Sequence, residues 1–233
     1  MTIEKLTTVV LAAGKGKRLR SELPKVLHRV AGRALVVHVL DAVSSLSSGR
    51  VAVVVSADGD PVRDAAEEGG FGDIDLVIQD PPNGTADAVR VAIEDRGIDE
   101  GLLLVVNGDM PLVRSETLRA LIDVVTARKA AGAVLTARVA EPGDLGRIVR
   151  GGDGSLERIV EARDATPEEL EISEINCGAY VFDAALVSDL ISKVDRENAQ
   201  GEFYLTDVVQ LLVVVLTIAR RRATVIHGSR QIR

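Results

Sequence analysis

The chain has 233 residues, 46% of them hydrophobic, and a formal net charge of -7. This length and apolar content suit one large α/β domain, or one domain with a small appendage. The acidic balance argues against a general nucleic-acid-binding or anionic-membrane surface, because both need a dominant basic face. Any polyanion that the protein handles is therefore expected to be small and locally bound.

Short apolar runs alternate with helical periodicity through the first part of the chain. Runs rich in Val, Ile and Leu predict strands at Thr7–Ala12, Val51–Ser56, Ile74–Gln79, Leu102–Val106 and Ala133–Val139. Apolar residues three and four apart predict helices around Leu35–Leu46, Val62–Glu68, Thr85–Arg96 and Ser115–Ala131. The alternation indicates right-handed βαβ units on a mostly parallel sheet with helices on both faces.

The alternation of predicted strands and helices ends after about Glu141, where glycines separate two short strand candidates. Arg147–Arg150 and Leu156–Glu161 predict a β-hairpin insertion. A strand at Glu174–Phe182, a helix at Ala184–Ser192 and a last helical segment from about Tyr204 are expected to follow.

Cysteine usage and apolar runs bear on the compartment. The single cysteine, Cys177, cannot form an internal disulfide, and the first residues lack the apolar core of a signal peptide, so we expect a cytoplasmic protein. The most apolar run, Leu211–Ala219, is nine residues long, whereas a membrane-spanning helix needs about 20. It is expected to be a core helix or strand, and no membrane partner is predicted.

The end of the first predicted strand has the features of a phosphate site. In open α/β sheets, ligands bind beyond the carboxyl ends of the strands, where Leu11, Ala12, Ala13, Gly14 and Gly16 lie. The glycines allow backbone N–H groups to approach phosphate oxygens. Cations surround this turn at Lys15, Lys17, Arg18, Arg20 and Lys25. The spacing G-K-G-K-R excludes a Walker-type loop, and G-x-G alone is most often an ordinary turn.

The whole string is more specific than its glycines. L-A-A-G-x-G-x-R followed by P-K resembles the signature of sugar-1-phosphate nucleotidylyltransferases. The chain is most similar to the uridylyltransferase half of the bacterial bifunctional N-acetylglucosamine-1-phosphate uridylyltransferases that are also glucosamine-1-phosphate acetyltransferases. The stretches that carry this resemblance are LPKVLHRVAGRAL (23–35), QDPPNGTADAV (79–89), NGDMPL (107–112), GRIVR (146–150), EINCGAYVFD (174–183) and EFYLTDVV (202–209).

The resemblance implies a Rossmann-like nucleotidyltransferase fold with a mixed, mostly parallel sheet and a β-hairpin over the sugar site. It implies one domain over 1–233, with a nucleotide-binding part at about 1–112 and a sugar-binding part at about 113–233. The substrates would be UTP and N-acetylglucosamine-1-phosphate, and the products UDP-N-acetylglucosamine, a cell-wall precursor, and pyrophosphate. Both substrates are anions, so the enzyme mainly holds them in line and stabilises charge.

Roles for individual residues follow from the same resemblance. Arg18 and Lys25 would be catalytic, Leu11 to Gly14 and Gly16 would bind nucleotide, and Asp109 would be a ligand of Mg²⁺, which prefers hard oxygen donors. Gln79, Gly84 and Thr85 would recognise uracil, since an amide both donates and accepts.

One departure concerns this base loop. Ala86 and Asp87 stand where relatives usually have glycine and histidine, which leaves the fine contacts to base and sugar open.

Gly146, Glu161 and Asn176 would hold the amino sugar. Relatives commonly have an aromatic residue before the glycine, where this chain has Leu145. The alternatives are that Glu161 is a surface carboxylate and Asn176 a strand-end cap. Tyr204 and Asp207, in EFYLTDVV, resemble a family motif at the start of a helix near the active site. The alternative is that they only cap this helix.

Two family features are missing. The chain ends ATVIHGSRQIR without the V-N-x-R-type segment that supplies a second metal ligand, and it has no hexapeptide repeats of a left-handed β-helix. Acetyl transfer is therefore not predicted, and oligomeric state stays open. Two functional alternatives also remain: transfer with another sugar phosphate or pyrimidine nucleotide, and a catalytically weak domain that binds nucleotide sugars.

Overall fold

The computed structural model describes residues 5–14, 16, 21–46, 49–72 and 74–218, with backbone only at 216–218. An eight-stranded sheet has the order β5-β4-β1-β6-β10-β8-β9, and β7 pairs with β10. Its strands are β1 (Leu6–Leu11), β4 (Arg50–Val55), β5 (Asp75–Ile78), β6 (Leu102–Asn107), β7 (Gly132–Arg138), β8 (Arg147–Arg150), β9 (Leu156–Val160) and β10 (Glu174–Asp183). The helices are α1 (Leu35–Ser44), α2 (Asp60–Glu68), α3 (Thr85–Arg96), α4 (Ser115–Arg128), α5 (Pro167–Leu170), α6 (Ala184–Ile191) and α7 (Leu205–Ile218).

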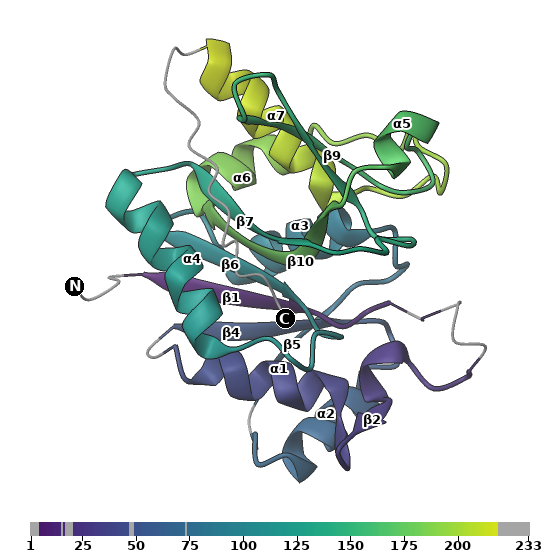
Figure 1. Ribbon diagram of the computed structural model, residues 1–233. Helices are drawn as coiled ribbons and strands as arrows, with labels where there is room; N and C mark the ends of the chain where they lie inside the picture. Colours follow the sequence, from purple (N-terminus) through teal and green to yellow (C-terminus); the bar gives the residue numbers. More distant parts are fainter. Residues whose placement is uncertain (1–4, 15, 17–20, 47–48, 73, 219–233) are drawn as a thin grey trace.

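The predicted parallel part of the sheet is confirmed. β1 lies between β4 and β6 and is parallel to both, and β5 extends the parallel set beyond β4. Successive side chains of a strand point to opposite faces. Val9 therefore packs with α3, α6 and α7 on one face, and Val10 packs with α1, α2 and α4 on the other. Figure 1 shows α1 and α2 below the sheet and α6 and α7 above it, with β1 near the centre.

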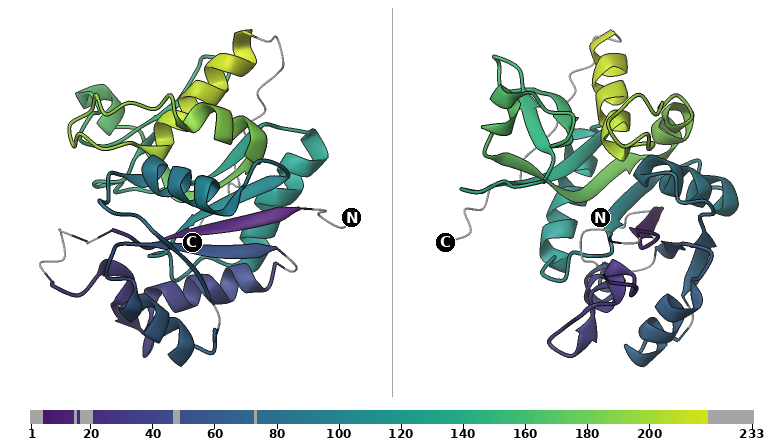
Figure 2. Two further views of the ribbon diagram at one scale, coloured as in Figure 1. Left: turned by 180° about the vertical axis from the view of Figure 1, so that it is seen from behind. Right: turned by 90° about the vertical axis from the view of Figure 1, so that its right-hand side faces the viewer.

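The strand predicted at Ala133–Val139, β7, does not pair with the parallel strand that precedes it, β6. β7 exists as predicted and runs in the same direction as β6, but β10 lies between them and is antiparallel to both. Alternating apolar runs show that a strand exists but not which strand pairs with it. The insertion of β10 turns a parallel sheet into a mixed one, and the two further views show the twist of this sheet and its helices (Figure 2).

The predicted hairpin insertion is also present. β8 and β9 pair antiparallel, and β8 reaches the sheet through one pair of partners, Arg147 and Ile175 of β10. A small hairpin that was not predicted from the sequence consists of β2 (Arg29–Val30) and β3 (Arg33–Ala34). Its turn residues Ala31 and Gly32 have φ angles of 51° and 81°, a primed-turn geometry that usually selects Asn-Gly rather than Ala-Gly.

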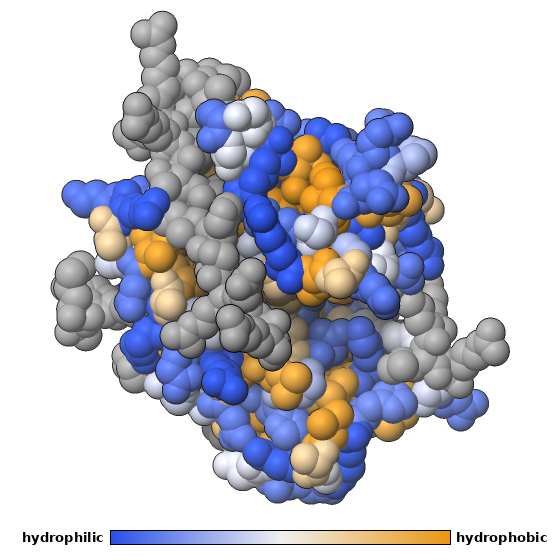
Figure 3. Space-filling model, viewed as in Figure 1, coloured by the Kyte–Doolittle hydropathy of each residue, from blue (hydrophilic) through white to orange (hydrophobic). Residues whose placement is uncertain are grey.

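The apolar run at Leu211–Ala219 belongs to α7, so its helical alternative is confirmed as far as Ile218. The expectation that the run lies in the core is only partly right: Leu212 is buried, whereas Val214 is 48% and Val215 39% exposed. Hydrophobic surface is visible over the region of α7 and β9 (Figure 3). Among the described residues, no helix has the length and apolarity needed to cross a membrane.

Candidate functional site

The carboxyl ends of β1 and β6 meet and form the floor of the predicted phosphate site. The N–H of Gly108 donates to Leu11 O at 2.9 Å, and that of Ala12 donates to Val54 O at 2.8 Å. Ala12 and Ala13 are buried, while Gly14 is exposed. The strand ends therefore hold the start of the glycine loop firmly and leave Gly14 accessible.

Gly16 and Lys25 lie against each other. Gly16 has a φ of +62°, and a Cβ added to it would be 2.7 Å from Lys25 Cβ. A side chain here would be both strained and obstructed. Glycine at this position thus lets the loop approach the lysine closely.

Lys25 forms an ion pair with Asp109, the predicted metal ligand. The lysine begins a 3-10 helix whose next residues, Val26 and Leu27, are buried and anchor it, and Asp109 follows β6. The two side chains are 46% and 24% exposed. A pair this accessible to solvent contributes little to stability, so both groups can exchange partners. Arg18, the other predicted catalytic residue, lies outside the described residues.

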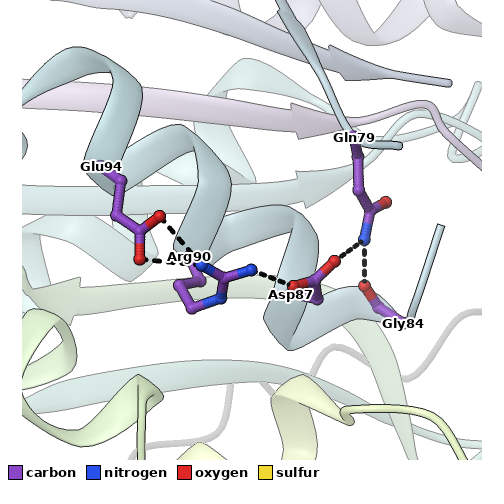
Figure 4. Close-up of polar contacts among 5 residues, drawn as sticks. All are labelled: Gln79, Gly84, Asp87, Arg90 and Glu94. Carbon is purple, nitrogen blue, oxygen red and sulfur yellow. Dashed lines mark hydrogen bonds and ion pairs between the residues drawn. The ribbon is translucent and has the colours of Figure 1, made fainter. Parts of the chain in front are cut away.

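The loop between β5 and α3 holds the predicted base-recognition residues. Gln79 is 2% exposed, and its Nε2 donates to Gly84 O at 3.0 Å and to Asp87 Oδ2 at 2.8 Å. Asp87 Oδ1 in turn accepts from Arg90 at 2.5 Å, and Arg90 donates to both carboxylate oxygens of Glu94 at 2.9 Å. Figure 4 shows this chain of contacts along α3. The hydrogen bonds that Arg90 donates to Asp87 and Glu94 raise the pKa of its guanidinium, which stays charged.

Gly84 and Thr85 join this loop to the start of α7. Gly84 has a φ of +119°, and a Cβ on it would collide with the backbone of Phe203. The N–H of Leu205 donates to Thr85 Oγ1 at 2.9 Å. The Thr85 hydroxyl therefore satisfies a free N–H at the first turn of α7. No acceptor in the described part of the chain takes the hydrogen of this hydroxyl, and the predicted contact of Thr85 with nucleotide stays a prediction.

The three predicted sugar-binding residues lie together although they come from separate elements. The N–H of Asn176 in β10 donates to Gly146 O at 2.9 Å. A Cβ added to Gly146 would lie 3.5 Å from both carboxylate oxygens of Glu161. Leu145, beside them, is 48% exposed.

Asn176 also has a structural task. Its Nδ2 donates to Tyr180 Oη at 2.6 Å, and its Oδ1 accepts from the N–H of Gly178 at 3.1 Å. These bonds span the register shift that separates Asn176 from Tyr180 in the pairing of β10 with β7. The side chain therefore stabilises a β-bulge, and among the described residues the second N–H hydrogen of its amide has no acceptor.

Comparison with known proteins identifies the family. The profile of the MobA-like NTP transferase domain matches residues 8–169, more than half of the chain. The chain belongs to this family.

Two curated relatives of this NTP transferase domain are named "Bifunctional protein GlmU". The protein of Corynebacterium diphtheriae is 43% identical over 206 residues, which cover 87% of this chain and 43% of that protein. The protein of Bordetella petrii is 44% identical over 211 residues, which cover 89% of this chain and 45% of that protein. The chain thus spans less than half the length of the curated relatives it matches.

The fold has a counterpart among solved structures. UDP-glucose pyrophosphorylase, solved with UDP-glucose, superposes with a TM-score of 0.71 at 16% identity, covering 88% of this chain and 85% of that one. At this identity the likeness shows the fold alone.

The structure brings two further residues of the NTP transferase domain to the junction of its predicted halves. Asn107, at the end of β6, lies so close to Gly178 that a Cβ on this glycine would collide with its amide. Tyr180, the partner of Asn176, is buried, and burial raises the pKa of its hydroxyl. Asn107 stands inside the stretch NGDMPL, the same local signal that predicts Asp109.

A cavity of about 510 Å³ lies between β9, α7 and the segment joining α6 to α7 in this NTP transferase domain. Of the predicted catalytic, nucleotide-binding, sugar-binding and metal-binding residues that the structure describes, only Glu161 lines it, so it is not the strand-end crevice. Asp207 of α7 also lines it, and burial, with the charges of Asp195 and Asp164, raises the pKa of this carboxyl from 3.8 to about 6. Tyr204 and Asp207 thus face this cavity.

Cys177 is partly buried, and burial raises the pKa of its thiol to about 11. The thiol is therefore protonated at neutral pH, which argues against a nucleophilic role.

Proposed function

We propose that the chain transfers the uridylyl group of UTP to N-acetylglucosamine-1-phosphate, giving UDP-N-acetylglucosamine and pyrophosphate. The observation that supports this most is the Lys25–Asp109 pair beside Gly16, at the strand ends of a nucleotidyltransferase fold. The curated relatives named GlmU, at 43–44% identity, support the uridylyl and amino-sugar specificity. In this proposal residues up to about 112 bind the nucleotide and the rest binds the sugar.

The reaction needs no side-chain nucleophile. An oxygen of the sugar phosphate, already ionised at neutral pH, forms a bond to the α-phosphorus, and the bond from this phosphorus to the bridging oxygen breaks. Pyrophosphate leaves with the electron pair. Lys25 stabilises the negative charge that builds on the α-phosphate, and Arg18 holds the triphosphate. Glu161 accepts hydrogen bonds from the sugar and Asn176 donates to it. These bonds hold the sugar phosphate in position for attack on the α-phosphorus.

Asp109 fits a divalent cation as a single carboxylate ligand. In the described ranges no group of three or more His, Cys, Asp or Glu side chains could hold a metal. Mg²⁺ commonly takes only one or two carboxylates and completes its shell with phosphates and water. Asp109 would hold Mg²⁺, which would neutralise part of the charge of the phosphates, and Lys25 beside Asp109 would stabilise the α-phosphate.

The test is pyrophosphate release by the purified chain with UTP, CTP or dTTP, each combined with N-acetylglucosamine-1-phosphate or glucose-1-phosphate. We expect UTP with N-acetylglucosamine-1-phosphate to be the best pair and chelation of divalent cations to stop turnover. Turnover of another pair alone would contradict the substrates. Tight calorimetric binding of UDP-N-acetylglucosamine without turnover at saturating Mg²⁺ would instead identify a binding domain.

A further inference from the structure

A chain of polar groups, buried at Gln79 and Asp87 and exposed at Glu94, connects the base loop to the outer surface of α3 (Figure 4). Gln79 and Asp87 are 2% and 4% exposed, and the neighbours of Asp87 in α3, Ala86 and Ala88, are buried apolar residues. A carboxylate in such surroundings is costly unless it is paired and hydrogen-bonded. Asp87 satisfies that condition through Gln79 and Arg90.

This network decides which way the Gln79 amide faces. A carboxylate only accepts hydrogen bonds, so the amide must turn its NH₂ group toward Asp87. The backbone oxygen of Gly84, also only an acceptor, takes the other N–H. Both amide hydrogens are thus engaged inside the protein. The oxygen points away from Asp87 and Gly84, and it has no hydrogen-bond partner within the described ranges.

Arg90 and Glu94 keep Asp87 in this state. The guanidinium holds one carboxylate oxygen of Asp87 at 2.5 Å, which leaves the other for Gln79 at 2.8 Å. Glu94 binds Arg90 through both of its oxygens and restrains the arginine side chain. The spacings of three and four residues place all of these groups on one face of α3.

We propose that Asp87 is a positioning residue that locks the Gln79 amide with its oxygen facing the nucleotide base. This inference rests on the proposed function and deepens it, because a fixed acceptor favours a base with a ring N–H. Uracil and thymine carry that donor at N3, whereas cytosine has a lone pair there, which would face the amide oxygen without a proton between them. Asp87 therefore determines a preference for UTP over CTP without touching the base.

The first experiment compares kcat/KM for UTP and CTP at saturating N-acetylglucosamine-1-phosphate. We expect the wild-type protein to favour UTP by about 100-fold or more, as sites built around a substrate hydrogen bond do. In Asp87→Asn, the side-chain oxygen stays on Arg90 and the NH₂ group turns to Gln79, so the amide can flip. The UTP to CTP ratio should then fall by about tenfold. The matched control Glu94→Gln should keep it within about twofold, because Asp87 and Arg90 remain.

The second experiment observes the amide itself, without nucleotide. In ¹⁵N NMR spectra the side-chain NH₂ of Gln79 should exchange slowly with water in the wild-type protein. Exchange should be faster in the Asp87→Asn protein and, to a smaller extent, in the Arg90→Gln protein. The Arg90→Gln variant replaces Asp87→Asn in this test if the latter does not fold.

Two results would overturn the inference. One is an unchanged UTP to CTP ratio in the Asp87→Asn protein, or equal use of both nucleotides by the wild type. The other is rapid exchange of the Gln79 amide in the wild type. Failure of the wild-type protein to bind or use any nucleotide would instead reject the proposed function, and the NMR measurement would still test the lock.

Discussion

The residues proposed for the nucleotide follow the carboxyl ends of the parallel strands β1, β5 and β6, whereas those for the sugar come from the antiparallel strands β8 and β10 and the end of β9. Parallel strands end at a common edge, so residues distant in sequence converge there without further devices. On the sugar side, Gly146 and Asn176 meet because of one backbone pairing between β8 and β10. The nucleotide side is thus built by topology, and the sugar side by local registers.

The two sides also differ in the structural roles of their polar side chains. Within the described part of the chain, Lys25 and Asp109 pair only with each other, in an accessible position, so both side chains can turn to a ligand. Asn176, by contrast, holds the bulge of β10 through Tyr180 and Gly178. Mutations of Lys25 or Asp109 should therefore affect the reaction more than folding, while mutation of Asn176 should affect both.

The largest expected effect is that of Lys25→Ala on catalysis. Loss of a charge aimed at the transition state should lower kcat by about 10² to 10³ with little change in KM for the sugar phosphate. The matched control is Lys5→Ala. Lys5 is also an exposed lysine paired with an acid, Glu100, but it precedes β1, at the end of the strand away from the phosphate site. Steady-state kinetics of both variants check this, and equal activity of Lys25→Ala would remove the lysine from its proposed role.

Gly84→Ala should have the next largest effect, on folding of the junction between the base loop and α7. The substitution combines a φ of +119° with a collision against Phe203, and we expect a loss of about 2–4 kcal/mol in the free energy of unfolding. Gly97→Ala is the control, since Gly97 has a φ of +59° but no atom near its Cβ position; it should cost about 1 kcal/mol. Urea titrations that gave equal losses would show that the contact with Phe203 is unimportant.

Glu161→Gln should affect the sugar side selectively. Replacing a charged acceptor by an amide should raise KM for N-acetylglucosamine-1-phosphate by about tenfold and leave KM for UTP unchanged. Glu157→Gln, an exposed position of the same hairpin, should change neither. A rise in both KM values would indicate that the two sides are coupled rather than separate.

The smallest expected effect is the pH dependence of stability at Asp207, outside both sides. The folded protein binds this proton more tightly than the unfolded chain, because the pKa is raised from 3.8 to about 6. Stability should therefore fall as pH rises from about 4 to about 6, by roughly 1 kcal/mol after allowance for solvent screening. Asp207→Asn should be more stable than the wild type at pH 7.5 and similar at pH 3.5.

Thermal unfolding at both pH values checks this, with Asp195→Asn expected to give part of the same gain because it removes a neighbouring charge. An Asp207→Asn protein with the same pH dependence as the wild type would contradict the assignment.

Much of the nucleotide side could be predicted before the structure. Strand β1, the glycines after it, Gln79 after β5 and Asp109 after β6 are all local signals that coincide with strand ends. The bulge at Asn176 and the hydrogen bond between Thr85 and α7 could not be predicted, because the bulge depends on the pairing of β10 with β7 and the hydrogen bond joins residues remote in sequence. The exposed half of α7 was mistaken for core, since an apolar run reports the composition of a helix and not what covers it.

The sequence by itself determined the alternation of strands and helices, the glycine-rich phosphate loop and the identity of the groups that meet at the strand ends. These are local properties, because periodicity and glycine content act on neighbouring residues. Only the tertiary structure decided that β10 separates β6 from β7, that Lys25 pairs with Asp109, and that Asp87 turns the amide of Gln79. The first depends on strand register, the second on two segments remote in sequence that meet in space, and the third on the orientation of a buried amide. Long-range packing and hydrogen-bond satisfaction fix all three.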